Sequence, residues 1–165
     1  MRKTLIYIDA CCFGVFVEKR IDVEAQAEMR FLLAAIEYGR LRFLHSSWLR
    51  TELSETRPVS KARKLLSYVP QQAGFVGLSA EVKQEAQRLA RWTGLESDPS
   101  GLYDCRHLAS ALHGGANFLV TFDSNFHEKC RQHVKLFAAW RPFRVVWLPG
   151  WEQEVYGEIE PEKQE

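Results

Sequence analysis

Short apolar runs alternate along the chain with longer segments of helical periodicity. The apolar runs predict strands at 5–8, 41–45, 118–122 and 143–148. Apolar residues three and four positions apart predict helices at 23–38, 48–55, 60–68, 79–92, 103–112 and 124–132. Strands that alternate with helices favour a central, mostly parallel sheet covered by helices on both faces. The sequence therefore predicts an α/β fold, a three-layer α/β/α sandwich.

The boundaries between these elements contain residues that typically cap helices, end them or form loops. Gly39 follows the first long helix, Ser46 or Ser47 can cap the next one, and Pro58 stops it. The Gly-, Pro- and Ser-rich stretch at 94–101 predicts a loop. The chain shows no internal repeat and no low-complexity linker, and its 165 residues suit a single domain. We expect one domain over 1–150 and a frayed acidic tail over 151–165.

The N-terminal segment combines basic and apolar residues in a way that partly resembles a signal peptide. Asp9 interrupts its apolar stretch, however, and charged residues at 18–20 stand where a cleavage site would be. No run of 18 apolar residues is present. We therefore expect a cytoplasmic protein that does not cross a membrane. The four cysteines show no CxxC spacing and are expected to be small buried residues.

Positive charge is concentrated in one part of a nearly neutral chain. The net charge is +1, yet the segment 40–64 holds seven basic residues and two acidic ones. Such a segment can follow the phosphates of a nucleic acid, and a solvated helix face explains it equally well. Trp48 and Trp92 are weaker candidates for base stacking, since tryptophans are more often core residues. The candidate RNA-binding residues are Arg50, Arg57, Lys61, Arg63 and Lys64.

Four acidic residues occupy positions where this kind of fold places its site. Asp9 and Asp123 directly follow predicted strands, Glu52 lies about one turn into a helix, and Asp104 lies in the first predicted turn of another. Capping of the following helix is the structural alternative for a carboxylate after a strand. Because the carboxyl ends of parallel strands share one edge of the sheet, we expect the four carboxylates to form a joint site.

Carboxylates that converge repel one another unless a cation lies between them. Oxygen ligands alone favour Mg²⁺ or Mn²⁺, which can generate a hydroxide nucleophile and stabilise charge on a phosphoryl group. Zinc is disfavoured because Cys105, His107 and His113 lack ligand spacing. His107, one turn after Asp104, is better explained as a packing or capping histidine. No serine–histidine pair or activated cysteine is evident.

Four segments, in order, resemble the acidic motifs of PIN-domain ribonucleases. They are LIYIDACCF, SSWLRTEL, DCRHLASAL and NFLVTFDSNF, and together they extend from Leu5 to Phe126. The resemblance implies a PIN-like domain in which Asp9, Glu52, Asp104 and Asp123 are the catalytic, metal-binding cluster. It further implies that Thr121 helps to orient that cluster, with Asn125 as another polar position of the last motif.

The same resemblance implies a function and partners. Many members are toxins of VapBC-like toxin–antitoxin pairs, which cleave RNA and are inhibited by an antitoxin protein. The likeness implies a 5′-phosphate and a 3′-hydroxyl as products, and a homodimer formed through apolar residues of the helices between Val23 and Tyr68. One departure is Cys11, which replaces the Asn, Ser or Thr common at this position, and a thiol is a poor hydrogen-bond donor. Asp98 is a possible fifth acid, although a turn explains it better.

The leading hypothesis is therefore a divalent-metal-dependent endoribonuclease that uses four carboxylates. The first alternative is a non-catalytic PIN-like module that binds RNA or protein, which a missing acid would have favoured. The second is a phosphatase with Asp9 as nucleophile, but this chemistry usually requires a second aspartate at the position of Cys11.

Overall fold

The computed structural model describes residues 3–71, 73–137 and 142–157. Its centre is a five-stranded sheet in the order β3-β2-β1-β4-β5, and every pair of neighbouring strands is parallel. The strands are β1 (Leu5–Ile8), β2 (Arg42–Ser46), β3 (Ala73–Val76), β4 (Phe118–Thr121) and β5 (Arg144–Trp147).

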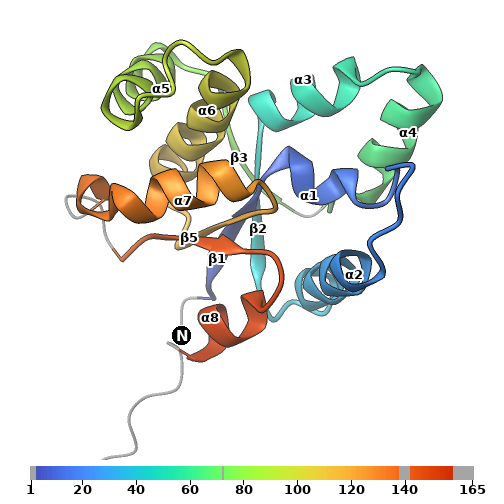
Figure 1. The fold of residues 1–165 in the computed structure, drawn as a ribbon. Helices are drawn as coiled ribbons and strands as arrows, with labels where there is room; N and C mark the ends of the chain where they lie inside the picture. The colour runs from blue at the N-terminus through green and yellow to red at the C-terminus, as the bar shows by residue number, and fades with distance from the viewer. Residues whose placement is uncertain (1–2, 72, 138–141, 158–165) are drawn as a thin grey trace, which may run out of the picture.

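Helices cover both faces of the sheet, with α2 and α4 on one side and α6 and α7 on the other (Figure 1). Helix α5 packs against α6, and α3 packs against α4. The three-layer α/β/α prediction is confirmed, and the sheet is entirely parallel. The helices are α1 (Ala10–Gly14), α2 (Val23–Glu37), α3 (Ser47–Glu55), α4 (Val59–Tyr68), α5 (Ala80–Thr93), α6 (Pro99–His113), α7 (Ser124–Gln132) and α8 (Trp151–Gly157), with a 3₁₀-helix, η1 (Val134–Phe137).

The structure differs from the sequence prediction in several elements, among them the short helices α1 and η1, which were not predicted. Strand β3 was not predicted, because it is a short edge strand with exposed Ala73 and Phe75. Helix α6 begins at Pro99 with Asp98 as its N-cap, so Asp104 lies in its second turn, and the predicted first-turn position was wrong. The predicted frayed tail was also wrong over 151–157, where α8 buries Trp151 and Val155; residues 158–165 lie outside the described part.

Strand register determines which residues meet at the carboxyl edge of the sheet. Ile6, Tyr7 and Ile8 of the central strand β1 are fully buried, as expected for a strand covered on both faces. Ile8 pairs with Val120 in β4, and Tyr7 pairs with Leu44 in β2. The next residue, Asp9, therefore lies beside the ends of both neighbouring strands.

The turns that start and end these helices follow ordinary capping rules. Ser46 is the N-cap of α3, and its side chain accepts a hydrogen bond from the Leu49 amide at 3.0 Å. Gly39 follows α2 with a φ of 69°, a conformation that glycine adopts readily. No helix in the described ranges has the length and apolar character needed to cross a membrane.

Candidate active site

All four predicted acids line one cleft at the carboxyl edge of the sheet. Asp9, Glu52, Asp104 and Asp123 surround a volume of about 290 Å³. They come from the end of β1, from α3, from α6 and from the end of β4. The topology thus brings together residues that are separated by as many as 114 positions in the chain.

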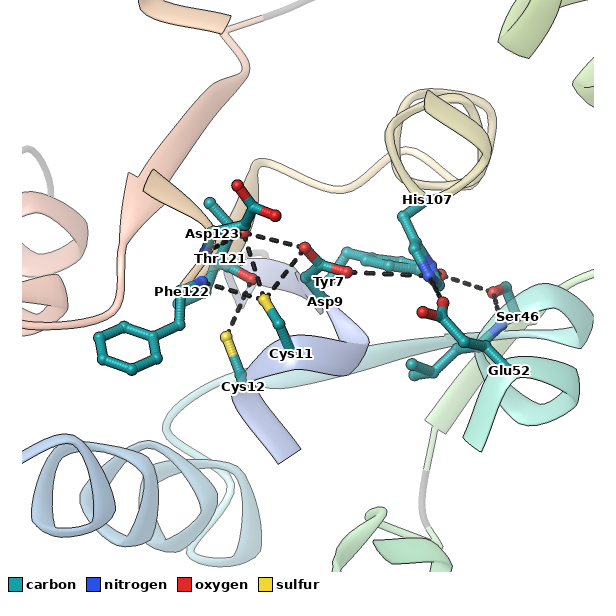
Figure 2. A network of polar contacts seen from close by, with 12 residues as sticks. Tyr7, Asp9, Cys11, Cys12, Ser46, Glu52, His107, Thr121, Phe122 and Asp123 are labelled. Carbon is teal, nitrogen blue, oxygen red and sulfur yellow. Dashed lines mark hydrogen bonds and ion pairs between the residues drawn. The ribbon is translucent and has the colours of Figure 1, made fainter. Parts of the chain in front are cut away.

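Asp9 is held in place by side chains rather than used as a helix cap. It is 2% exposed, and although it precedes α1 its carboxylate makes no capping hydrogen bond to that helix. Its Oδ2 atom accepts hydrogen bonds from Thr121 Oγ1 at 2.9 Å and from Cys11 Sγ at 3.3 Å (Figure 2). Capping, the structural alternative for an acid after a strand, therefore does not explain Asp9.

Thr121 connects two of the acids. The residue is fully buried, and while its hydroxyl donates to Asp9, its Oγ1 accepts a hydrogen bond from the Asp123 amide at 3.1 Å. Asp123 is the N-cap of α7, and its Oδ1 accepts from the Phe126 amide at 2.9 Å. Capping thus does occupy one oxygen of Asp123, and the second oxygen lies outside this hydrogen bond.

The thiol of Cys11 takes part in the same arrangement. Contact with Cys12, burial and the nearby Asp9 charge raise the pKa of Cys11 well above its usual value. The side chain therefore remains a thiol that donates to Asp9, while its sulfur accepts from the Phe122 amide at 3.2 Å. The family resemblance suggested that Cys11 supports the site only weakly. Its thiol does contact Asp9, as a weak hydrogen-bond donor.

His107 joins the site through a buried polar network that sequence reasoning did not assign to it. Its Nε2 is hydrogen-bonded to Glu52 Oε2 and lies 3.7 Å from Asp9 Oδ1. On the other side of the ring, Nδ1 is 2.6 Å from the Tyr7 hydroxyl, which is 2.6 Å from Ser46 Oγ (Figure 2). The histidine is neither a simple packing residue nor a helix cap, because it is hydrogen-bonded to one of the four acids and lies close to a second. No local pattern in the sequence marked this contact, because Glu52 lies 55 positions from His107.

Burial and mutual repulsion shape the electrostatics of the cleft. Burial first, and then the charges of Asp9, Asp123 and Glu52, raise the pKa of Asp104 to about 9. Burial also raises the pKa of Asp9. Burial acts to lower the pKa of His107, but the hydrogen bond to Glu52 and the charge of Asp9 outweigh it, and this pKa is raised. A cation in the cleft would relieve this repulsion.

The donor set has the chemistry of a hard divalent cation site. Asp9, Glu52 and Asp123 each use one carboxylate oxygen in the hydrogen bonds above, which leaves the other oxygen outside them. Their positions are looser than a closed coordination sphere: across the described ranges, no three His, Cys, Asp or Glu side chains lie close enough together to hold a metal. The residues fit Mg²⁺ or Mn²⁺ in type, and ion binding requires the carboxylates to move closer.

The structure distributes the predicted basic residues around the cleft unequally. Among the five, Lys61 of α4 lines the cleft in the part of the chain that is described. Arg50 lines a separate hollow beside His45, and Arg57, Arg63 and Lys64 are exposed. Asn125 is exposed in the first turn of α7 and does not line the cleft.

A larger hollow of about 880 Å³ lies elsewhere, between the end of α2, the start of β2 and the segment that joins α4 to β3. Parallel sheets of this kind place their sites at the carboxyl ends of the strands, and this hollow lies at the start of β2. The acidic cleft is therefore the candidate site.

Comparison with known proteins supports the fold. No protein-family model matches the chain, and no curated protein matches it. Among solved structures, the chain is similar to a chain in the crystal structure of VapBC2 from Rickettsia felis bound to a DNA fragment from its promoter. The TM-score is 0.51 with 12% sequence identity, over 87% of this chain and 98% of that chain. The chain thus has an α/β fold that matches a PIN-like structure, a chain of VapBC2.

Proposed function

We propose that this protein is a divalent-metal-dependent endoribonuclease. The observation that carries the proposal is the convergence of four carboxylates, from four different elements, in one cleft at the carboxyl edge of the sheet. The similarity of the fold to a component of a toxin–antitoxin complex is consistent with it. Hydrolysis of an RNA phosphodiester would leave a 5′-phosphate and a 3′-hydroxyl.

The roles of the chain's own residues follow from their contacts. Asp9, Glu52, Asp104 and Asp123 would hold Mg²⁺ or Mn²⁺, which when bound supplies a water of lowered pKa and stabilises charge on the phosphate. Thr121 keeps Asp9 and Asp123 at a fixed separation through its two hydrogen bonds.

Two further side chains assist these acids. His107 keeps the carboxylate of Glu52 directed toward Asp9. Lys61, the basic residue in the lining of the cleft, is placed to attract the phosphate of the substrate. The remaining basic residues of α3 and α4 would guide RNA toward the cleft from outside it.

We also propose that the protein forms a homodimer and binds an antitoxin-like protein. The support is the similar structure, which is that of a complex, and the presence of exposed apolar side chains on and beside α2 and α4. Val23 of α2 is 74% exposed, Tyr38 directly after α2 is 81% exposed, and Val59 of α4 is 51% exposed. These exposed apolar side chains are available for contact with a partner protein.

A non-catalytic RNA- or protein-binding module is the second candidate function. It is favoured by the absence, among the described side chains, of a closed group of three metal ligands. The two functions predict different outcomes when mixed RNAs are incubated with Mg²⁺, with Mn²⁺ and with EDTA. The nuclease proposal expects cleavage that EDTA abolishes and that Asp9→Asn lowers by orders of magnitude. Cleavage that persists in excess EDTA would refute the mechanism, and no cleavage of any RNA would favour the binding module.

A further inference from the structure

One aromatic and cationic cluster reaches the acidic cleft through Tyr103, the member of the cluster that lines it. The rings of Trp48 and Tyr103 are nearly parallel, with 5.2 Å between their centroids and 18° between their planes. The guanidinium of Arg106 lies 4.2 Å from the centre of the Trp48 ring and 5.5 Å from that of Tyr103. The three side chains therefore form one compact group that connects α3 with α6.

This group is built on the two helices that supply acids to the site. Trp48 precedes Glu52 by four residues in α3, so the two side chains share a helix face and are separated by one turn, or about 5–6 Å between Cβ atoms. Tyr103 and Arg106 flank Asp104 in α6. The group thus lies within one helical turn of Glu52 and Asp104 along the two helices.

Packing between α3 and α6 does not fully account for Tyr103. Tyr103 is 39% exposed and lines the same cleft as the four acids, so part of its side chain is open to a ligand in the cleft. Trp92 of α5 gives a contrast within the chain. It is 59% exposed and has Arg88 5.9 Å from its ring centre, but it does not line the cleft.

The chemistry of this group matches one class of ligand. Unpaired bases of single-stranded RNA stack on aromatic rings and on arginine planes, because every base has a π-face. A cationic group also adds attraction for the negative backbone. We propose that Trp48, Tyr103 and Arg106 form a base-stacking subsite. It binds one nucleobase of the RNA, next to the phosphodiester bond that the acidic cleft hydrolyses. The identity of this ligand rests on the proposed function.

The test measures binding without cleavage. A fluorescently labelled single-stranded RNA hexamer is titrated with the full chain in Ca²⁺, and the RNA is checked for integrity afterwards. Ca²⁺ accepts carboxylate ligands in a flexible geometry and takes the place of Mg²⁺. In a matched series of hexamers, each nucleotide in turn is replaced by an abasic one. We expect the loss of one particular base to weaken binding by about tenfold, in line with stacking on a single base.

The variants connect that base to the rings. Tyr103→Leu should bind the hexamer that lacks the sensitive base as tightly as it binds the intact hexamer. Tyr103→Phe keeps the ring and Trp92→Leu removes an aromatic residue outside the cleft, and both should behave like wild type. Far-UV circular dichroism verifies that each variant folds. If Tyr103→Leu does not fold, the wild-type series alone still overturns the subsite when every abasic hexamer binds as well as the intact one.

The outcomes separate this subsite from the nuclease proposal. If no RNA is cleaved in Mn²⁺ but one base shows a penalty that Tyr103→Leu removes, the subsite is supported and the nuclease proposal fails. If RNA is cleaved while all abasic hexamers bind as well as the intact one, the nuclease proposal remains and the subsite is overturned. Equal penalties in wild type and Tyr103→Leu, or no binding of any hexamer, would also overturn it.

Discussion

Asp104→Asn should make the metal-free protein more stable, although it removes a residue of the site. The carboxyl has a pKa of about 9 in the folded state, against 3.8 as the ordinary value, because burial and four neighbouring acids disfavour its charge. A raised pKa in an acid means that the folded state binds a proton more tightly than the unfolded state. Stability is therefore lost as the pH rises from the unfolded pKa toward the folded one.

The size of the effect follows from these two pKa values. At pH 7 the pKa difference acts over about 3 units, which at 1.36 kcal/mol per unit gives an upper limit of about 4 kcal/mol. Partial exposure and the adjustment of neighbouring acids reduce this value, so we expect a gain of about 1–3 kcal/mol. For a domain of this size, the melting temperature should rise by roughly 3–10 °C.

Calorimetric melting of both proteins in EDTA at pH 4, 7 and 9 measures the effect. The difference should be small at pH 4 and should grow toward pH 9. The control Glu55→Gln removes an exposed carboxylate from α3 outside the cleft and should show no such trend. A melting temperature for Asp104→Asn that equals that of wild type at all three pH values would refute the reasoning.

Three further predictions concern the network and the assembly. His107→Gln should destabilise the fold by about 1–3 kcal/mol. The loss of stability should be largest below pH 6.5 and should shrink as the pH rises through the raised pKa of His107 in the folded state. Urea unfolding at pH 5.5 and pH 9 measures this loss, and a difference that does not depend on pH would count against the prediction. Cys11→Ser supplies a stronger donor to Asp9 and should keep or raise RNA cleavage, whereas Cys11→Val should lower it; the reverse order in a cleavage assay would contradict the assigned contact. Light scattering at tens of micromolar should show a homodimer, and a monomer would remove the proposed interface.

The positions of the acids were predictable because they depend on local patterns. An apolar run that ends in Asp, as before Asp9 and Asp123, places a carboxylate at the carboxyl edge of a parallel sheet. Register between β1 and β4 then aligns the two strand ends. The same logic extended to Glu52 and Asp104, because each lies on a helix that packs at that edge.

The hydrogen bonds that support the acidic residues could not be predicted from local sequence patterns. Tyr7 and His107 are 100 positions apart, and Asp9 and Thr121 are 112 positions apart, so their contacts depend on tertiary packing. A single histidine in a predicted helix gives no indication of the carboxylate that it contacts in the folded protein. Strand β3 was missed for a similar reason, because pairing with β2 rather than its own four residues maintains it.

The central claim is that the four carboxylates form one divalent cation site, and Mn²⁺ titration by isothermal calorimetry tests it most directly. Wild-type protein should bind Mn²⁺, and Asp9→Asn and Asp123→Asn should each weaken the binding by at least about tenfold, as expected for the loss of one charged ligand. Glu55→Gln should bind as wild type does. Mn²⁺ binding that neither aspartate substitution changes, or no binding to the wild-type protein, would contradict the account.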